Sequence, residues 1–513
     1  MRTIRAADSG AAAPENEIAT QCRDAARPLR APRDLDPLME QIGDARCVLL
    51  GEASHGTSEY YVWRTWLTQR LIREKGFSFI AVEGDWPDCY RVNRFVKGYP
   101  DAGATARDVL AEFRRWPTWM WANWEIVALA EWLRDWNAGR PESDRAGFYG
   151  LDVYSLWDSM DAVMRYLERV DGAALEAARR AFRCFEPYGD DGQDYARSTV
   201  ALIPESCEED AVAMLAALRR EQPDPRQDGR EAFFVAEQNA LIVKNAETYY
   251  RAMVRGGPHS WNVRDRHMVE TLDRLMRFHG PQAKAVVWEH NTHVGDACAT
   301  GMAADGMVNV GQLVREARAP GEWFVVGFGS YRGSVIAGRQ WGAPMERMPV
   351  PEARAGSWED LLHRAGPTDK LLLMDELRRR SGDHEPHGHI GADRRADGGP
   401  ASEHVTRTAQ RRTGAESAGE RSASQAAHHN GGAASGRPLP ASRCQLPVSE
   451  PRGHRAIGVV YQPAFEQWGN YVPTVLPDRY DAFLYIDETH ALHPLHIQPS
   501  ADAEPPETYP WNV

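Results

Sequence analysis

The chain of 513 residues is long enough for one large α/β unit or for as many as three domains of about 150 residues each. Hydrophobic residues make up 42% of it and charged residues 26%, a mixture that excludes collagen-like, coiled-coil and disulfide-scaffold proteins. The formal net charge of −13 disfavours nucleic acid and anionic membrane surfaces as partners. We therefore expect a globular protein with a large buried core.

The cysteines and the first residues of the chain favour a cytoplasmic location. The seven cysteines are scattered, odd in number and contain no C-x-x-C pair, which suits a reducing compartment. Residues 1–33 lack the apolar core of a signal peptide, and no run approaches the roughly 18 apolar residues of a membrane helix. These features predict no membrane partner, and they do not specify an oligomeric state.

The order of the apolar runs predicts a mostly parallel sheet flanked by helices. Residues 47–50 and 77–82 are short apolar runs separated by an amphipathic segment at 58–75, which together form a β-α-β unit. Further runs with the length of buried strands lie at 147–150, 285–288, 323–328, 456–461 and 482–486. This alternation is typical of the α/β class.

The composition divides the chain into segments. Residues 1–35 show no periodicity, which predicts a loose leader. The α/β core should extend over 36–380 and include a large helical insertion at about 155–280, where the spacing is helical. Residues 381–452 have too few aliphatic side chains to bury a core, so they are either disordered or an out-of-frame reading of GC-rich DNA. Strands within 453–513 should then complete the core.

Acids and histidines follow three of the predicted strands at the point where each strand ends. Glu52 and His55 follow the first strand, Glu83 follows the second, and His290 and His293 follow the run at 285–288. Because ligands bind beyond the carboxyl ends of the strands in open α/β sheets, we expect these five side chains to converge. A histidine can take a proton from water while a neighbouring carboxylate fixes its tautomer. The cluster therefore predicts general-base chemistry.

The same five side chains are also suitable ligands for a divalent metal such as zinc or manganese, and this alternative stays open. No H-E-x-x-H motif is present. Residues 51–56 read G-x-x-S-x-G rather than the G-x-S-x-G of serine hydrolases, and the chain has neither a P-loop nor a G-x-G-x-x-G motif. We expect no cofactor unless the cluster binds a metal.

Other side chains close to these strand ends are candidates for substrate contact. Arg64, two and a half turns into the helix after His55, should meet a substrate oxygen or an acid, unless it is solvated. Tryptophans at 116–121 suit either the wall of a pocket for a bulky apolar ligand or core packing. Asn262 should cap the next helix. The expected substrate-binding residues are Trp116, Trp119, Trp121, Asp85, Arg264 and Asp265.

These motifs resemble those of the erythromycin esterase family. The resemblance is carried by residues 51–56, 83–88, 116–121, 261–268 and 288–296, and it extends over about 48–329 and 453–489. It implies a bacterial cytoplasmic hydrolase that opens the lactone ring of macrolides by water attack, without a covalent intermediate. The residues that match the family's catalytic set are His55 as the base, Glu52 and Glu83 as essential acids, His290 and His293 as a second histidine pair, and Arg64 as the helix arginine.

We therefore predict a hydrolase of a small-molecule ester or lactone in which His55, oriented by Glu52 or Glu83, activates a water molecule. His290, His293 and Arg64 would stabilise the oxyanion and the leaving group. Two alternatives remain: a metal-dependent hydrolase that uses the same cluster, and a protein that binds an apolar small molecule without turning it over.

Overall fold

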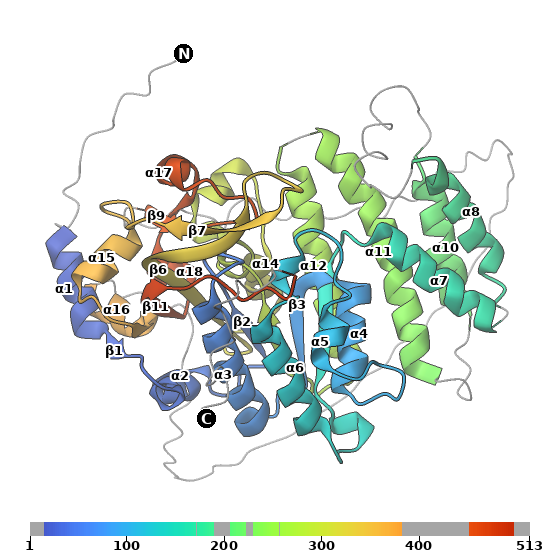
Figure 1. Cartoon of the computed structure of the whole chain (residues 1–513), viewed down its shortest axis with the longest axis horizontal. Coiled ribbons are helices and arrows are strands. Elements are labelled where there is room, and N and C mark those ends of the chain that lie inside the picture. Colours follow the sequence, from blue (N-terminus) through green and yellow to red (C-terminus); the bar gives the residue numbers. More distant parts are fainter. Residues whose placement is uncertain are drawn as a thin grey trace, which may run out of the picture.

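A central sheet of nine strands organises the computed structural model, which describes residues 15–170, 172–188, 206–221, 229–255, 257–381 and 451–496 (Figure 1). The strand order is β1-β8-β11-β6-β2-β5-β3-β4, with β7 paired to β6. The six strands from β11 to β4 run parallel to one another, whereas β1, β8 and β7 are antiparallel to their neighbours. This arrangement confirms the predicted mostly parallel α/β sheet.

The strand bounds agree with most of the predicted runs. The sheet contains β1 (Arg27–Pro28), β2 (Cys47–Leu50), β3 (Phe79–Asp85), β4 (Gly147–Asp152), β5 (Ala285–Trp288), β6 (Trp323–Gly338), β7 (Met345–Val350), β8 (Lys370–Leu373) and β11 (Ala482–Thr489). A separate two-stranded sheet pairs β9 (Arg452–Arg455) with β10 (Tyr471–Thr474). The predictions missed β1, β7 and β8 of the large sheet and both strands of the small one, all of which are short or carry charged residues.

The predicted strand at 456–461 is wrong. These residues make only isolated bridges, from Ile457 to Ser54 and from Val460 to Gly338. The backbone N–H of Ile457 donates to the Ala53 carbonyl, 2.8 Å away. The run crosses the carboxyl end of the sheet, where Ile457 and Tyr461 are buried, and it does not join the ladder.

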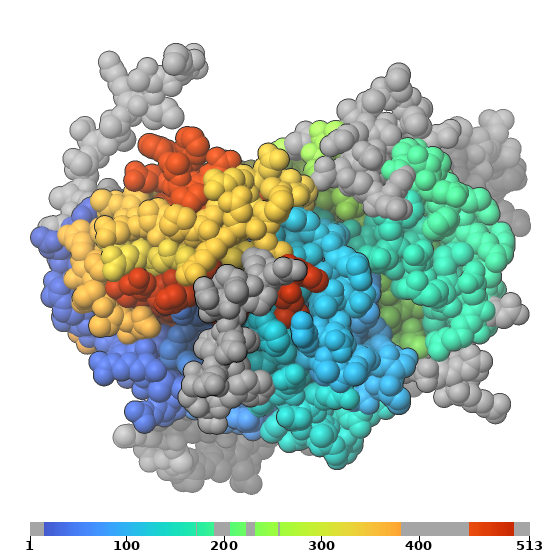
Figure 2. Space-filling view, viewed as in Figure 1, coloured from blue at the N-terminus to red at the C-terminus, as the bar shows by residue number. Residues whose placement is uncertain are grey.

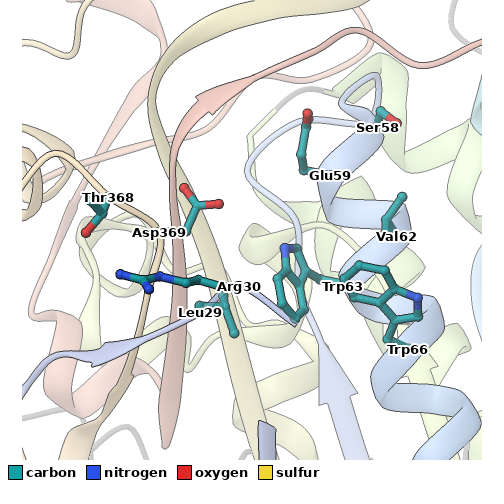
Figure 3. A pocket seen from close by; sticks show the side chains of 9 residues that line it. All are labelled: Leu29, Arg30, Ser58, Glu59, Val62, Trp63, Trp66, Thr368 and Asp369. Atoms are coloured by element: carbon teal, nitrogen blue, oxygen red, sulfur yellow. The ribbon is translucent and has the colours of Figure 1, made fainter. Parts of the chain in front are cut away.

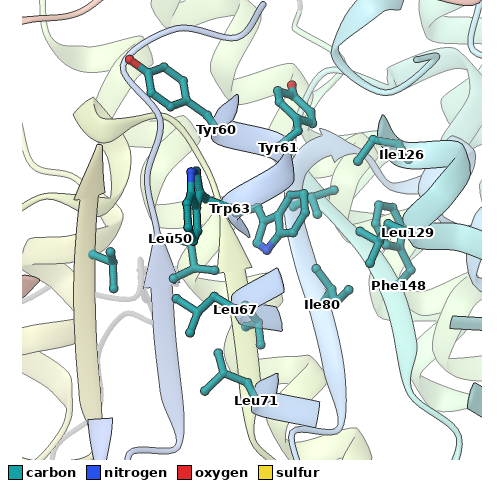
Figure 4. Packing of buried hydrophobic residues seen from close by; sticks show 14 of the residues in the cluster. Leu50, Tyr60, Tyr61, Trp63, Leu67, Leu71, Ile80, Ile126, Leu129 and Phe148 are labelled. Atoms are coloured by element: carbon teal, nitrogen blue, oxygen red, sulfur yellow. The ribbon is translucent and has the colours of Figure 1, made fainter. Parts of the chain in front are cut away.

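Helices cover both faces of the sheet, because the central strands β2, β3, β4 and β5 are buried on both sides. In β2, Val48 and Leu50 belong to one buried cluster while Cys47 and Leu49 belong to another. Figure 4 shows the first cluster, in which side chains of α3 such as Leu67 point toward the sheet. The helices beside the sheet are α1 (Glu15–Ala25), α2 (Asp36–Ile42), α3 (Ser58–Lys75), α4 (Trp86–Val96), α5 (Ala106–Leu110), α6 (Trp124–Asn137), α13 (Asn291–Val294), α14 (Val310–Ala317), α15 (Trp358–Arg364), α16 (Met374–Ser381), α17 (Glu466–Gly469) and α18 (Leu476–Arg479).

The first helix differs from the expectation of a loose leader at 1–35. In α1, Ala19, Cys22 and Ala25 are buried, a spacing of three residues that lies on one helical face. β1 then pairs with β8. Residues 1–14 of the expected leader lie outside the described residues, as do 382–450 of the expected low-complexity segment.

The chain between β4 and β5 is helical, as predicted. It contains α7 (Leu156–Val170), α8 (Leu175–Phe185), α10 (Glu208–Arg220), α11 (Gly229–Arg255) and α12 (His259–His279). The first four helices share a buried cluster of their own and form the green and teal part of the surface beside the sheet (Figure 2). A disulfide joins Cys184 to Cys207, and Cys298 is also disulfide-bonded, which the scattered cysteines did not predict.

A segment that we call the C-terminal strap, residues 490–495, follows β11 and lies against the loop after β2. The N–H of Ser58 donates to the His490 carbonyl at 2.8 Å, and the N–H of Leu492 donates to the Gly56 carbonyl at 2.9 Å. The strap then reaches Ala122, whose carbonyl accepts the N–H of Leu495 at 2.8 Å. Across the described ranges, no helix is both long and apolar enough to cross a membrane.

Candidate active site

The predicted acids and histidines converge at the carboxyl ends of β2, β5 and β3, which are adjacent in the sheet. Glu52 lies two residues after β2, Glu83 lies within β3, and His290 lies two residues after β5. His55 is 7% exposed and each of the others less, so all five side chains are buried. They share one enclosed site.

Two glycines allow the loop between β2 and α3 to pack closely. A Cβ at Gly51 would lie 2.1 Å from Oδ1 of Asn291, and a Cβ at Gly56 would lie 1.9 Å from the carbonyl oxygen of Ile336. Glycine is therefore required here for close approach. The tight packing fixes the loop that carries Glu52 and His55.

Glu52 holds the His55 ring in one orientation. Nδ1–H of His55 donates to Oε1 of Glu52 at 2.9 Å, and Nη2 of Arg64 donates to Oε2 of the same carboxylate at 2.5 Å. Arg64 is fully buried, with its guanidinium over the rings of Tyr61 and Trp288. Of the outcomes expected for Arg64, the structure shows contact with an acid.

The other face of His55 is directed toward Glu83. Nε2 of His55 lies 3.9 Å from Oε1 of Glu83, too far for a direct hydrogen bond. Burial opposes protonation of His55, but the carboxylates of Glu83 and Glu52 raise its pKa above the usual 6.5. Nε2 is therefore an unusually basic nitrogen that faces the Glu83 carboxylate without bonding to it directly.

Glu83 is fixed on both oxygens. Oε2 accepts the backbone N–H of His290 at 2.8 Å, and Oε1 accepts Nη2 of Arg264 at 2.8 Å. Although burial opposes ionisation, the Arg264 guanidinium, the His55 ring and the backbone N–H of His290 hold the pKa of Glu83 well below its usual range. Glu83 is consequently an anion throughout the neutral range.

The structure separates the two histidines that follow β5. Nδ1–H of His293 donates to Asp265 at 2.9 Å, and its Nε2 accepts Nη1 of Arg264 at 3.0 Å. The Trp261 ring stacks on His293 with centroids 4.4 Å apart. Both nitrogens of His293 are therefore occupied, and the ring positions Arg264.

His290 has one ring nitrogen, Nε2, that is available for a hydrogen bond to a substrate. Its Nδ1 accepts the backbone N–H of Thr292 at 3.3 Å, and burial together with His55 holds the pKa of His290 well below its usual value. The neutral ring therefore carries its proton on Nε2. This buried nitrogen has no hydrogen-bond partner among the described residues, and its ring centroid lies 4.9 Å from that of His55.

Two acids in the site were not among the predicted residues. Asp152, the last residue of β4, accepts Nε and Nη2 of Arg264 at 2.9 and 2.6 Å. It could have been found by the rule that found Glu83, because it also ends an apolar run. Both carboxyl oxygens of Glu289 lack a partner within the described ranges, and burial raises its pKa well above the usual value. Burial therefore favours the neutral form of Glu289, which lies beside the anionic Glu83.

Asn262 and Asp265 differ from the expected helix cap. The helix α12 begins at His259, so Asn262 lies inside it and donates to the Gly306 carbonyl. Asp265 is fully buried and binds His293 instead. The cap predicted at Asn262 is wrong because Pro258 takes the position before the helix.

The predicted aromatic residues divide into two groups. Trp119 and Trp121 are buried in the core beside the sheet, and Nε1 of Trp121 donates to the Glu83 carbonyl at 3.1 Å. Trp116 is half-buried and lies against Trp341, with centroids 4.6 Å apart. Asp85 is paired with Arg115 through two hydrogen bonds of 2.5 and 2.9 Å.

The donor set is relevant to the metal alternative. Within the part of the chain that the structure describes, no three His, Cys, Asp or Glu side chains are grouped so as to hold a metal ion. Glu83 and His293 direct an oxygen and a nitrogen at Arg264.

A cavity of about 460 Å³ lies elsewhere, against α3. Leu29, Trp63, Trp66 and Asp369 are among the residues in its walls, and none of the predicted catalytic residues lines it (Figure 3).

Comparison with known proteins agrees with this fold and shows the family. The erythromycin esterase family matches residues 72–489. An erythromycin esterase type II of Escherichia coli is 22% identical over 373 residues, which cover 67% of this chain and 84% of that protein.

Solved structures share the fold. A Bacillus cereus protein has a TM-score of 0.67 at 17% identity, covering 94% of this chain and all of that one. A succinoglycan biosynthesis protein has a TM-score of 0.64 at 19% identity, covering 94% and 98%. An erythromycin esterase mutant in its open conformation has a TM-score of 0.55 at 14% identity, covering 90% and 95%.

Proposed function

The chain belongs to the erythromycin esterase family, and on that premise we propose that it is a hydrolase that cleaves an ester or lactone bond in a small molecule. The observation that carries the proposal is the Glu52–His55 pair, whose hydrogen bond of 2.9 Å leaves Nε2 of His55 directed into the site. This is the geometry of a general base.

In the proposed reaction, Nε2 of His55 takes a proton from a water molecule that Glu83, whose Oε1 lies 3.9 Å from this nitrogen, orients. The oxygen of this water attacks the ester carbonyl. The imidazolium that forms is stabilised by Glu52 and returns its proton to the leaving alkoxide. No covalent bond to the protein is needed.

His290 is the proposed donor to the oxyanion. Its Nε2–H is buried and unpartnered within the described residues, so it loses nothing when a developing negative charge accepts it. Arg264, held by Asp152 and His293, is the nearest cation. Arg64 acts through Glu52 and is a positioning residue, because its side chain is fully buried.

Macrolide lactones are the first substrates to test, since the Escherichia coli relative is named an erythromycin esterase. Antibiotic resistance and a cytoplasmic location are part of this proposal. The half-buried Trp116 would contact the apolar body of the substrate, while Asp85, Arg264 and Asp265 maintain the polar wall.

We further propose that no metal is required, because the nitrogen and oxygen lone pairs of His293 and Glu83 are already directed at Arg264. The decisive experiment is mass spectrometry of macrolides, simple lactones and esters after incubation with chelator-treated protein and with its His55→Ala variant. A gain of one water that requires His55 supports the proposal. Activity restored only by zinc or manganese would favour the metal alternative, and stoichiometric binding without product would favour a binding protein.

A further inference from the structure

The exposure of the side chains rises along one continuous path that leads out of the site. Glu83 has a side chain 5% exposed and contacts Arg264, at 12%. The ring of Tyr154 lies 4.8 Å from the Arg264 guanidinium and 5.0 Å from the Arg115 guanidinium. The side chain of Arg115 is 39% exposed. The residue after Arg115 in the chain is Trp116. Its ring lies 4.6 Å from that of Trp341, a residue that is 57% exposed. These contacts connect Glu83 to the surface around Trp116 and Trp341.

A second route of contacts ends at the same place. The Gly56 carbonyl, next to His55, accepts the N–H of Ile336 at 3.0 Å. Two residues further along β6, a Cβ at Gly338 would lie 3.1 Å from the Trp116 ring. The pair of tryptophans therefore lies between the β2 loop and the Arg115 side of the site.

The charged side chains along the path are ion-paired with one another. Arg264 is paired with Glu83 and Asp152, and Arg115 is paired with Asp85, so two arginines face three carboxylates. The path consequently offers aromatic surface and, among its described residues, no unpaired cation for an anionic group of a ligand. Apolar contact is the interaction it favours.

Aromatic exposure continues beyond Trp341. Four large hydrophobic residues are exposed within the described ranges, and three of them, Trp341, Phe465 and Trp468, come from two segments that contact each other. Nε2 of Gln462 donates to the Arg339 carbonyl at 3.1 Å, and β7 contacts the turn that carries Phe465. The exposed rings are therefore carried by neighbouring segments, and exposed apolar side chains of this kind are typical of an interaction site.

We propose that Trp116, Trp341 and Phe465 form an aromatic platform at the mouth of the site that binds the apolar body of the ester substrate. This proposal rests on the proposed hydrolase function and specifies the substrate class, which is esters with an extended apolar acyl or ring portion. Trp341 is the residue that selects them, because it is the most exposed ring in contact with the path.

The test compares p-nitrophenyl octanoate with p-nitrophenyl butyrate. The wild-type protein should prefer the longer ester, and Trp341→Ala should lower the ratio of the two kcat/KM values about tenfold. Trp341→Phe should restore most of that ratio. Val212→Ala, which changes the fourth exposed apolar residue on α10, should leave the ratio unchanged. An unchanged ratio in Trp341→Ala overturns the proposal.

Binding separates this proposal from the function on which it rests. Calorimetry with 2-undecanone, a ketone that cannot be hydrolysed, should show binding weakened about tenfold by Trp341→Ala. If the wild-type protein binds the ketone through Trp341 but hydrolyses no ester, the platform stands and the hydrolase function fails. If Trp341→Ala leaves binding intact and instead converts a dimer into a monomer, the rings form a self-association surface and the platform is wrong.

Discussion

His293 accepts a hydrogen bond from Arg264 on Nε2, at 3.0 Å, while its Nδ1–H is bound to Asp265. The ring has no lone pair for a water molecule, in contrast to His55. Two histidines that look alike in the sequence therefore have different roles, one as a base and one as a positioning group. Mutations should separate them.

His55→Ala should lower kcat by about 10³-fold or more, because it removes the general base. His290→Ala should lower kcat by about 10²-fold, the usual effect of losing one oxyanion donor. Steady-state kinetics on the best ester gives both values, and circular dichroism checks the fold. A His290→Ala protein with wild-type kcat would remove His290 from the mechanism.

The rate should fall on the acid side with an apparent pKa above 6.5. His55 must be neutral to accept a proton, and the carboxylates raise its pKa, so activity is lost as the pH falls through that raised value. Glu83, whose pKa is lowered, stays ionised in this window. Glu83→Gln removes one of the charges that raise the pKa of His55, so the acid limb of the residual rate should move to lower pH. A shift in the opposite direction would contradict this assignment.

Arg64→Met should destabilise the protein by about 3–5 kcal/mol, because it leaves the buried Glu52 carboxylate without its cation. The matched control is Arg179→Met, whose ion pair with Glu176 is exposed and should be worth less than about 1 kcal/mol. Urea unfolding measures both. Adding Glu52→Gln to Arg64→Met should recover part of the loss, and no recovery would show that charge is not the cause.

Gly56→Ala should cost about 1–3 kcal/mol and lower activity, because the new methyl group would meet the backbone of Ile336. Gly301→Ala is the control, since its nearest neighbour is the Pro473 side chain at an ordinary 3.5 Å. Thermal unfolding of the two variants should differ clearly. Equal melting temperatures would show that the β2 loop is less tightly packed than described.

The C-terminal strap should be bound more tightly at acid than at alkaline pH. A hydrogen bond to Glu125 raises the pKa of His493, so the stabilising pair is complete below about pH 6.5 and is lost as the pH rises through the raised value. The Tm difference between the wild-type protein and His493→Ala should therefore be larger at pH 6 than at pH 9. The reverse order would exclude a protonated His493 in the pair.

The part of the site that the sequence predicts is the part that follows strands. Glu52, Glu83 and His290 could be placed together because parallel strands bring their carboxyl ends to one edge. The roles of Arg264 and Asp265 could not be derived in this way, since they depend on how α12 crosses that edge after a long insertion. The prediction of a strand at 456–461 is wrong because an apolar run indicates contact with the core and does not show whether the segment pairs with other strands.

The strap also bears on the order in which the protein matures. The loop with His55 is made within the first tenth or so of synthesis, yet the Gly56 carbonyl and the Ser58 N–H find partners in Leu492 and His490. The backbone around the base is thus completed by residues that leave the ribosome more than four hundred positions later. A nascent chain that stops after β11 would carry every proposed catalytic side chain while its catalytic loop still lacked these two hydrogen bonds.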